Sequence, residues 1–287
     1  MDTLPSFIGP FTSDWPWDSP LPGIRLVATR FDPALFDEQA GACAPSDCHG
    51  VTLPPRLHGA IAKRQAEYVA GRLCAQRALW LLDGRDACPG MNDDRSPRWP
   101  VDCVGALTHN DGWAAALVAH RQAYLGLGLD AERLLGTEEA WRLARRVLAP
   151  GEATRLAQLA PSNVGLMVSA TFSLKESLFK ALYPLVGRMF HFQSAELVAW
   201  HGLGAVRLRL REDLGSGWVA GREVTGMVCL NNGRILSLVA LPVTGAEAGH
   251  PPEPPIAADP NGGHHDGVVT RREAPHGRPG LRKSARG

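Results

Sequence analysis

The sequence predicts an α+β protein of two pseudo-symmetric halves, each a long helix packed on antiparallel strands, with a cleft between the halves. Two observations predict this class. Each half contains one helix-length segment, residues 57–82 and residues 172–182, together with short β-rich runs separated by turn residues. The second half also places Asn231-Asn232-Gly233 between two apolar runs, which is the signal of a β-hairpin.

The elements follow in a regular order. Residues 24–31 predict a strand, and the helix of residues 57–82 comes next, with Leu57, Ile61, Tyr68, Leu79 and Leu82 on one side. Further strands are predicted at residues 105–109, 114–119, 124–130, 195–200, 205–210, 224–230 and 234–241. Residues 136–161 predict a helical region between the halves, with Thr137 as its N-cap and acidic residues in the first turn.

We divide the chain into an N-terminal extension (residues 1–20), a first half (21–123), a second half (124–244) and a tail (245–287). The tail has no aromatic residue, many prolines and paired glycines, so it cannot bury enough apolar area to offset its chain entropy. We therefore predict that it is disordered. Four histidines in the tail could bind a metal weakly, but a solvated tail is the favoured interpretation: His250, His264, His265 and His276.

Composition excludes several classes of protein. With 45% hydrophobic and 21% charged residues, the chain resembles an ordinary globular protein. A net charge of +1 gives no general attraction to nucleic acid or to a membrane surface. No run approaches the ~20 apolar residues that span a bilayer, and no secretory signal begins the chain, so we expect a cytoplasmic location. The six cysteines include no CxxC pair and are expected to be free thiols.

The segment "GLGLDAERL" contains the first candidate site. Side chains alternate along a strand, so Asp130 and Glu132 are predicted to share one face. Two neighbouring carboxylates repel each other unless a cation lies between them, and Mg²⁺ prefers such oxygen ligands. The alternative is a strand that runs out into a charged turn, where Arg133 neutralises the pair.

The segment "FSLKESLFKAL" raises a second question. Lys175, Glu176 and Lys180 fall within one sector of an otherwise apolar helix at about 100° per residue. The simple interpretation is an exposed Glu→Lys pair one turn apart, which stabilises a helix by only a few tenths of a kcal/mol. The functional interpretation is that this sector faces a charged ligand.

Basic side chains elsewhere could bind phosphate. Arg72 lies in the apolar sector of its helix, where it needs either a buried ion pair or a bound anion, and Arg64 lies eight residues before it. Arg95 and Arg98 flank Pro97 in a loop beside Trp99, which can be a nucleotide contact or an ordinary surface turn. His109 closes an apolar strand, where a histidine is either structural or a ligand group.

In this order, these motifs resemble those of the Sfp-type 4′-phosphopantetheinyl transferases. The last motif matches the branch that reads F-x-x-K-E-S, and the nearest likeness is to the enterobactin-synthetase type and its pseudomonad relatives. The likeness extends over residues 21–241 and rests on Arg64, Arg72, "RSPRWP", "LTHNDGWAAALVA", "GLGLDAE" and "FSLKESLFKALYPL". It implies the fold of that family, in which the two halves form a cleft.

The resemblance implies an activity: transfer of 4′-phosphopantetheine from coenzyme A to a serine of an apo carrier protein, with release of 3′,5′-ADP. It implies a Mg²⁺ site at Asp130, Glu132 and Glu176, with Glu176 as the base and with Lys175 and Lys180 facing phosphate. Coenzyme A would be bound by Arg64, Arg72, Arg95, Thr108, His109, Lys175 and Lys180. Two departures stand out: Ala131 lies between the acids, where many relatives have a larger aliphatic residue, and Arg95-Ser96-Pro97 replaces the usual loop sequence.

The implied partners are acyl carrier proteins or the carrier domains of polyketide and peptide synthetases, served by a monomer, without nucleic acid or membrane. Carrier proteins are acidic near the modified serine, so a basic patch at Arg142, Arg145, Arg146 and Arg155 is a candidate docking surface; the alternative is a solvated helix face. Two rival functions remain: a Mg²⁺-dependent nuclease or phosphohydrolase, and a catalytically silent coenzyme A-binding regulator.

Overall fold

The computed structural model of the chain describes residues 4–36 and 50–243. The predicted disordered tail, its histidines and the cysteine pair Cys43 and Cys48 lie outside these residues. None of the described helices is long and apolar enough to cross a membrane.

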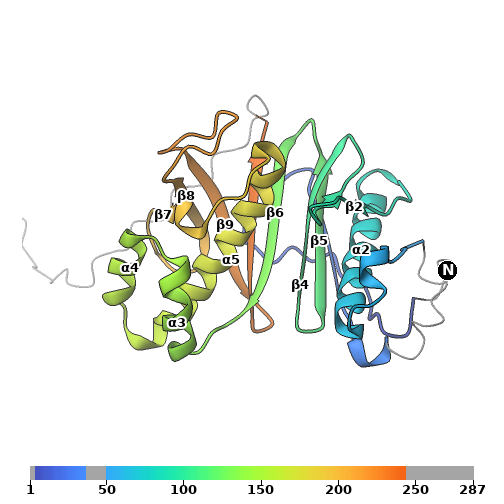
Figure 1. Cartoon of the computed structure of the whole chain (residues 1–287), viewed down its shortest axis with the longest axis horizontal. Helices are drawn as coiled ribbons and strands as arrows, with labels where there is room; N and C mark the ends of the chain where they lie inside the picture. The colour runs from blue at the N-terminus through green and yellow to red at the C-terminus, as the bar shows by residue number, and fades with distance from the viewer. Residues whose placement is uncertain (1–3, 37–49, 244–287) are drawn as a thin grey trace, which may run out of the picture. The chain divides into compact units, whose positions relative to one another are not determined.

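A three-stranded antiparallel sheet forms the first part of the fold, in the order β1-β5-β4. Its strands are β1 (Arg25–Arg30), β5 (Trp113–His120) and β4 (Cys103–Asn110), and helix α2 (Ala62–Asp83) packs on one face (Figure 1). Short pieces complete it: η1 (Pro33–Leu35), η2 (Pro55–Leu57) and the two-stranded β2 (Gly90–Met91) and β3 (Pro97–Arg98). The helix is held by a core of small and aliphatic side chains, including Val69, Leu73 and Leu79.

A five-stranded antiparallel sheet forms the second part, in the order β6-β10-β9-β8-β7. The strands are β6 (Tyr124–Arg133), β10 (Arg234–Pro242), β9 (Glu223–Asn231), β8 (Gly204–Leu210) and β7 (Ala195–Leu197). Helix α5 (Pro161–Val186) packs on this sheet, and α3 (Thr137–Val147), α4 (Pro150–Ala157) and η3 (Phe192–Ser194) lie beyond it (Figure 1). The predicted α+β class, with helices on antiparallel sheets, is confirmed.

The two sheets share an apolar core. Leu26, Leu117, Leu127 and Leu129 belong to one buried cluster that joins residues of both sheets. At one edge, β4 lies alongside β6 (Figure 1). We call this edge the β4–β6 seam, and it brings the ends of two predicted motifs together.

Helix α5 lies unusually close to β6. A Cβ atom placed on Gly128 would be 1.7 Å from the Ser177 carbonyl oxygen, so only glycine allows this approach. On the same side of the helix, the hydroxyls of Ser173 and Ser177 each lie 2.8 Å from that of Ser237 on β10. Small side chains therefore seat the helix directly on the backbone of the sheet, which fixes what its charged side chains can reach.

Local details correct three expectations. Ile61 is 74% exposed and precedes α2 as its N-cap, so the predicted apolar stripe is wrong at its start, because residues 55–57 form a separate turn. The predicted helical region of residues 136–161 forms two helices, because Leu148 takes an extended conformation after α3. Thr137 is not a cap: Gly136 occupies that position. The two-residue hairpin turn is confirmed, with positive φ at Asn232 and Gly233.

Candidate active site

Two carboxylates of β6 face helix α5. Asp130 is 5% exposed, and its Oδ1 accepts a hydrogen bond of 2.7 Å from Lys180 Nζ. Lys180 also donates to the Leu129 carbonyl oxygen at 2.9 Å, which leaves its third N–H for another acceptor. Among the described residues, the buried Oδ2 of Asp130 has no hydrogen-bond partner. A buried carboxylate oxygen without a partner fits a cation ligand.

Glu132 and Glu176 complete the acidic group. The pKa of Glu132 is raised to about 7, chiefly by burial and also by the charges of Asp130 and Glu176, while the charge of Lys180 opposes the shift. Burial also raises the pKa of Glu176; Lys180 opposes this shift and Asp130 adds to it. The three carboxylates thus influence one another electrostatically, and within the described chain Lys180 is the ammonium that offsets their charge. This oxygen-only donor set fits a Mg²⁺ ion, which would offset their repulsion.

Strand β4 approaches these acids across the β4–β6 seam. Asn110 Nδ2 donates to Glu132 Oε2 at 3.3 Å, and the buried Oδ1 of Asn110 has no partner within the described chain. Thr108 Oγ1 accepts a hydrogen bond of 3.1 Å from the Ala131 backbone N–H. The Ala131 side chain is 1% exposed and belongs to the core between the sheets, so it points away from the carboxylates. The Ala131 side chain is therefore not part of the acidic group.

A second charged group connects α2 to the end of β4. Arg64 Nη1 donates to Glu67 Oε2 at 3.2 Å and to His109 Nε2 at 3.0 Å. His109 Nε2 must then be the unprotonated ring nitrogen, because a guanidinium can only donate. Burial lowers the pKa of His109, and Glu67 opposes this shift while Arg64 adds to it. These surroundings favour the neutral imidazole.

Arg72 lies further along α2 and is 4% exposed, as the apolar sector predicts. Its Nη2 donates to the Gly90 carbonyl oxygen at 3.0 Å, and its guanidinium lies 4.7 Å from the centre of the Tyr68 ring. Within the described residues, its buried Nε has no hydrogen-bond partner and no carboxylate forms an ion pair with it. A buried guanidinium without an anion is costly, so this position favours a bound anion.

The loop between β2 and β3 reaches across to helix α5. Tyr183 OH donates to Asp94 Oδ2 at 2.9 Å, one turn of α5 beyond Lys180. Hydrogen bonds from Ser96 lower the pKa of Asp94. Arg95, next in the chain, is exposed and has a φ of 73°, which is the left-handed region. The tether therefore places the exposed Arg95 loop on the α5 side of the seam.

The structure corrects the prediction that Lys175 faces the same side as Glu176 and Lys180. Its side chain is 2% exposed, and its ammonium is bonded to Glu152 and to the Val147 carbonyl oxygen rather than facing the acids. The reason is helical phase, because five residues rotate the side chain by about 140° relative to Lys180. The predicted shared sector was too wide. Lys175 is absent from the acidic group.

A hollow adjoins Glu176 on the outer side of α5. Its cavity volume is about 320 Å³, and Phe179, Met189, Phe190 and Phe192 contribute most of its apolar wall. Of the three acids, Glu176 lines this hollow, together with Lys175, and Asp130 and Glu132 do not. The volume is large enough for a slender ligand to lie beside Glu176.

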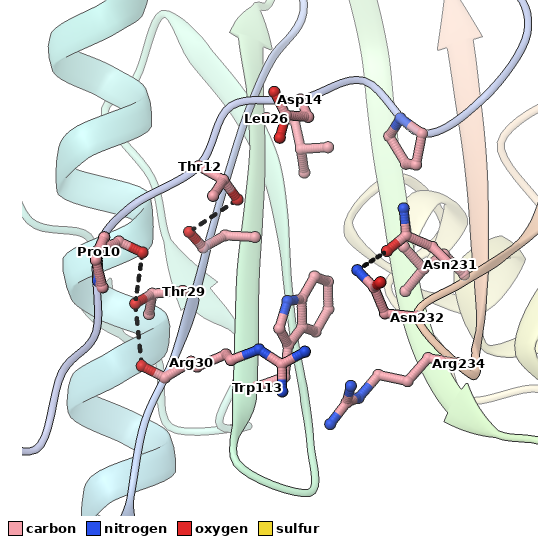
Figure 2. Close-up of a pocket in the computed structure, with 13 residues that line it drawn as sticks. Pro10, Thr12, Asp14, Leu26, Thr29, Arg30, Trp113, Asn231, Asn232 and Arg234 are labelled. Carbon is pink, nitrogen blue, oxygen red and sulfur yellow. Dashed lines mark hydrogen bonds between the residues drawn. The ribbon is translucent and has the colours of Figure 1, made fainter.

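A second hollow, of about 330 Å³, lies elsewhere (Figure 2). Arg30 lies on one side of it, and Asn231, Asn232 and Arg234, from the β9–β10 turn and the start of β10, lie on the other, with Trp113 between them. None of the three acids lines it, nor does Lys180. It is therefore separate from the candidate active site.

Comparison with known proteins relates both parts of the chain to one family. Residues 54–119 match the 4′-phosphopantetheinyl transferase N-terminal domain, and residues 126–235 match the 4′-phosphopantetheinyl transferase superfamily. The chain is 33% identical over 190 residues to 4′-phosphopantetheinyl transferase Svp of Streptomyces mobaraensis, covering 64% of this chain and 76% of that protein. The chain belongs to the 4′-phosphopantetheinyl transferase superfamily.

Other members of this superfamily show the same relationship. Enterobactin synthase component D of Escherichia coli (strain K12) is 28% identical over 210 residues, which is 73% of this chain and 95% of that one. Among solved structures, the holo-[acyl-carrier-protein] synthase of Thermotoga maritima is 21% identical over 41% of this chain and 63% of its own, with a TM-score of 0.31. The sequence relationships, not this partial structural likeness, establish the family.

Within this transferase, the structure adds three residues that the sequence did not single out. Glu67 bridges toward Arg64 and His109, Asn110 binds Glu132, and Glu152 pairs with Lys175. Glu67 could have been found from its i,i+3 spacing to Arg64, and Asn110 from its place two residues after Thr108 on the same strand face. Glu152 resembles an ordinary first-turn acid, so nothing local distinguished it.

Proposed function

We propose that this protein transfers the 4′-phosphopantetheine group of coenzyme A to a serine hydroxyl of an apo carrier protein and releases 3′,5′-ADP. The observation that carries the proposal is the 2.7 Å contact of Lys180 with the buried Asp130, whose other carboxylate oxygen has no partner among the described residues, together with the mutual electrostatic influence of Asp130, Glu132 and Glu176. Membership of the transferase superfamily supports it, together with basic side chains that reach the same seam from α2 and β4.

Asp130, Glu132 and Glu176 would hold the magnesium ion. The ion, when bound, supplies positive charge to the pyrophosphate oxygens of coenzyme A. Two features of these residues support cation binding: Oδ2 of Asp130 has no hydrogen-bond partner among the described residues, and neighbouring negative charges help to raise the pKa of Glu132. A bound cation would offset those charges.

The transfer itself needs one new bond and one proton acceptor. The serine hydroxyl oxygen attacks the β-phosphorus, and the bond from that phosphorus to the bridging oxygen breaks, so that 3′,5′-ADP leaves with this oxygen. Glu176 would accept the hydroxyl proton, because it is the carboxylate of this group that also lines the adjoining hollow. Lys180 directs its third N–H toward the phosphate oxygens, where negative charge accumulates.

Coenzyme A would be held on both sides of these acids. Arg64, His109 and Arg72 offer donors for its phosphates, and the uncompensated Arg72 suits the 3′-phosphate. Arg95 and Thr108 are proposed to contribute from the loop and the seam. The apolar hollow beside Glu176 suits the pantetheine arm, which is a slender chain that ends at the transferred phosphate.

The acceptor would be an acyl carrier protein or a carrier domain of a polyketide or peptide synthetase, modified by a monomer of this enzyme. On α3, Arg142, Arg145 and Arg146 are exposed and available to an acidic partner. Arg155 is not available in the same way, because it binds the Leu197 carbonyl oxygen and Glu196.

Mass spectrometry tests the proposal. The full chain is incubated with coenzyme A, Mg²⁺ and an apo carrier protein, and the carrier should gain about 340 Da, the mass of the transferred group. A carrier whose acceptor serine is replaced by alanine is the control and should gain nothing. Release of 3′,5′-ADP without any gain in carrier mass would contradict the proposal and favour a phosphohydrolase.

A further inference from the structure

Lys175 and Glu152 form a buried ion pair outside the acidic group. The Lys175 ammonium lies 2.6 Å from Glu152 Oε2 and 2.9 Å from the Val147 carbonyl oxygen, and the two side chains are 2% and 0% exposed. Burial lowers the pKa of Lys175, and the Glu152 carboxylate opposes that shift. Removing two charges from water is costly, and only close contact and additional hydrogen bonds offset that cost.

The Glu152 carboxylate is fully used. Its Oε2 also accepts from the Ala149 backbone N–H at 2.7 Å, and its Oε1 accepts from the Leu197 backbone N–H at 2.6 Å. The pair therefore joins the end of α3, the start of α4, strand β7 and helix α5. No oxygen of Glu152 remains for a ligand, in contrast to Asp130.

The pair also lies opposite the contacts that seat α5 on the sheet. Lys175 is about 160° around the helix from Ser177, whose hydroxyl contacts Ser237 on β10. Glu176 projects between these two sides. A rotation of about 20° would move a carboxylate 5–6 Å from the helix axis by about 2 Å, which is more than a metal site tolerates.

We propose that Lys175 and Glu152 are positioning residues: their ion pair fixes the rotation of α5 so that Glu176 meets Asp130 and Glu132, and Lys175 does not touch phosphate. The proposal rests on the proposed function only where transfer activity is measured. The position of Glu176 is also reported by metal binding, which needs no turnover.

A double-mutant cycle tests this assignment. The variants are Lys175→Met, Glu152→Gln and the two combined, because breaking a buried pair leaves one charge uncompensated whereas replacing both removes the conflict. Each single change should lower Tm by roughly 10 °C, and the double variant should recover most of that loss. Lys180→Met is the matched control for Lys175→Met, because Lys180 lies on the same helix but pairs with Asp130.

Binding of Mn²⁺ alone, followed by the electron paramagnetic resonance of the free ion, gives the readout that a purely structural pair would not change. Well below Tm, Lys175→Met and Glu152→Gln should each weaken Mn²⁺ binding several-fold, and the double variant should return to within about twofold of the wild type. Folded single variants with wild-type Mn²⁺ affinity would overturn the positioning role.

Transfer kinetics separate positioning from a direct phosphate contact. Positioning predicts that the double variant regains transfer with little change in KM for coenzyme A, although residue 175 carries no charge. A folded double variant that transfers far more slowly than the wild type, with raised KM for coenzyme A, would overturn the proposal. This comparison with the wild type holds even if the single variants fail to fold. If the wild-type chain transfers nothing, the proposed function fails, while the Tm and Mn²⁺ measurements still judge the pair.

Discussion

Lys175 and Lys180, five residues apart on helix α5, each pair with a carboxylate of another element. The two pairs differ in whether the carboxylate keeps an oxygen without a hydrogen-bond partner. Lys180 and Asp130 are 2.7 Å apart, with side chains 27% and 7% exposed, and Asp130 keeps one oxygen without a partner. Lys175 and Glu152 are 2.6 Å apart and almost fully buried, and both oxygens of Glu152 are bonded to backbone N–H groups. Distance alone does not distinguish the pairs. The unfilled oxygen does, and it marks the pair that can bind a cation.

The largest expected effect on turnover comes from the Lys180–Asp130 pair. Asp130→Asn should reduce turnover by at least about 100-fold, because it removes a proposed metal ligand and the charged partner of Lys180. Tm should change by only a few degrees, since Lys180 keeps the Leu129 carbonyl oxygen and some contact with solvent. Turnover is measured by carrier mass and Tm by calorimetry. Turnover close to wild type would remove Asp130 from the site.

Substitution in the Lys175–Glu152 pair should instead mainly affect the stability of the fold. Glu152→Ala leaves the Lys175 ammonium buried and two backbone N–H groups without acceptors, so it should cost about 3–5 kcal/mol of unfolding free energy. Denaturant unfolding measures this loss, with Glu139→Ala, a substitution of a half-buried acid in α3, as the control. Equal stability of the two variants would mean that the buried pair does not hold the fold.

Part of this contrast was predictable from sequence. Alternation along β6 places Asp130 and Glu132 on one face, and the apolar sector of α2 predicts a buried Arg72; both are confirmed. The phase of α5 was not predictable, because apolar residues surround the helix and do not reveal which side meets the sheet. Ser173 and Ser177 are that side, since their small size allows the close approach to the sheet. The sequence therefore predicts one shared sector for Lys175 and Lys180, whereas the structure separates them.

Arg72 extends the comparison to an unpaired cation. Arg72→Ala should raise KM for coenzyme A by roughly 10–100-fold, because a hydrogen bond to a charged phosphate contributes about 1.5–3 kcal/mol. The change should be much smaller with 3′-dephospho-coenzyme A if the 3′-phosphate is the partner. Steady-state kinetics with both substrates measures it. Equal losses would assign Arg72 another contact.

The acidic group should also respond to pH. Because the folded-state pKa of Glu132 is raised to about 7, the stability it contributes to the metal-free protein is present at low pH and lost as pH rises through that value. Tm without Mg²⁺ should therefore fall between pH 5 and pH 8, and stabilisation by Mg²⁺ should grow over the same range. Glu132→Gln should flatten both trends. A Mg²⁺ effect that is equal at both pH values would contradict this coupling.

The smallest effect is expected at the surface of α3. Reversing Arg145 and Arg146 to Glu should raise KM for the carrier protein several-fold at low salt and less at high salt, because exposed charges act mainly on association and are screened. KM for coenzyme A should stay constant. Reversal of Arg207 and Arg209, exposed on β8 and paired with Glu223, is the control. Unchanged carrier affinity would place docking elsewhere.

The central claim is that the open oxygen of Asp130 belongs to a metal site shared with Glu132 and Glu176. Titration of Mn²⁺ into the full chain with coenzyme A present, for the wild type and Asp130→Asn, tests it most directly. The account predicts one ion bound per wild-type chain and an affinity at least about tenfold weaker in Asp130→Asn. Equal affinities for the two proteins would contradict it.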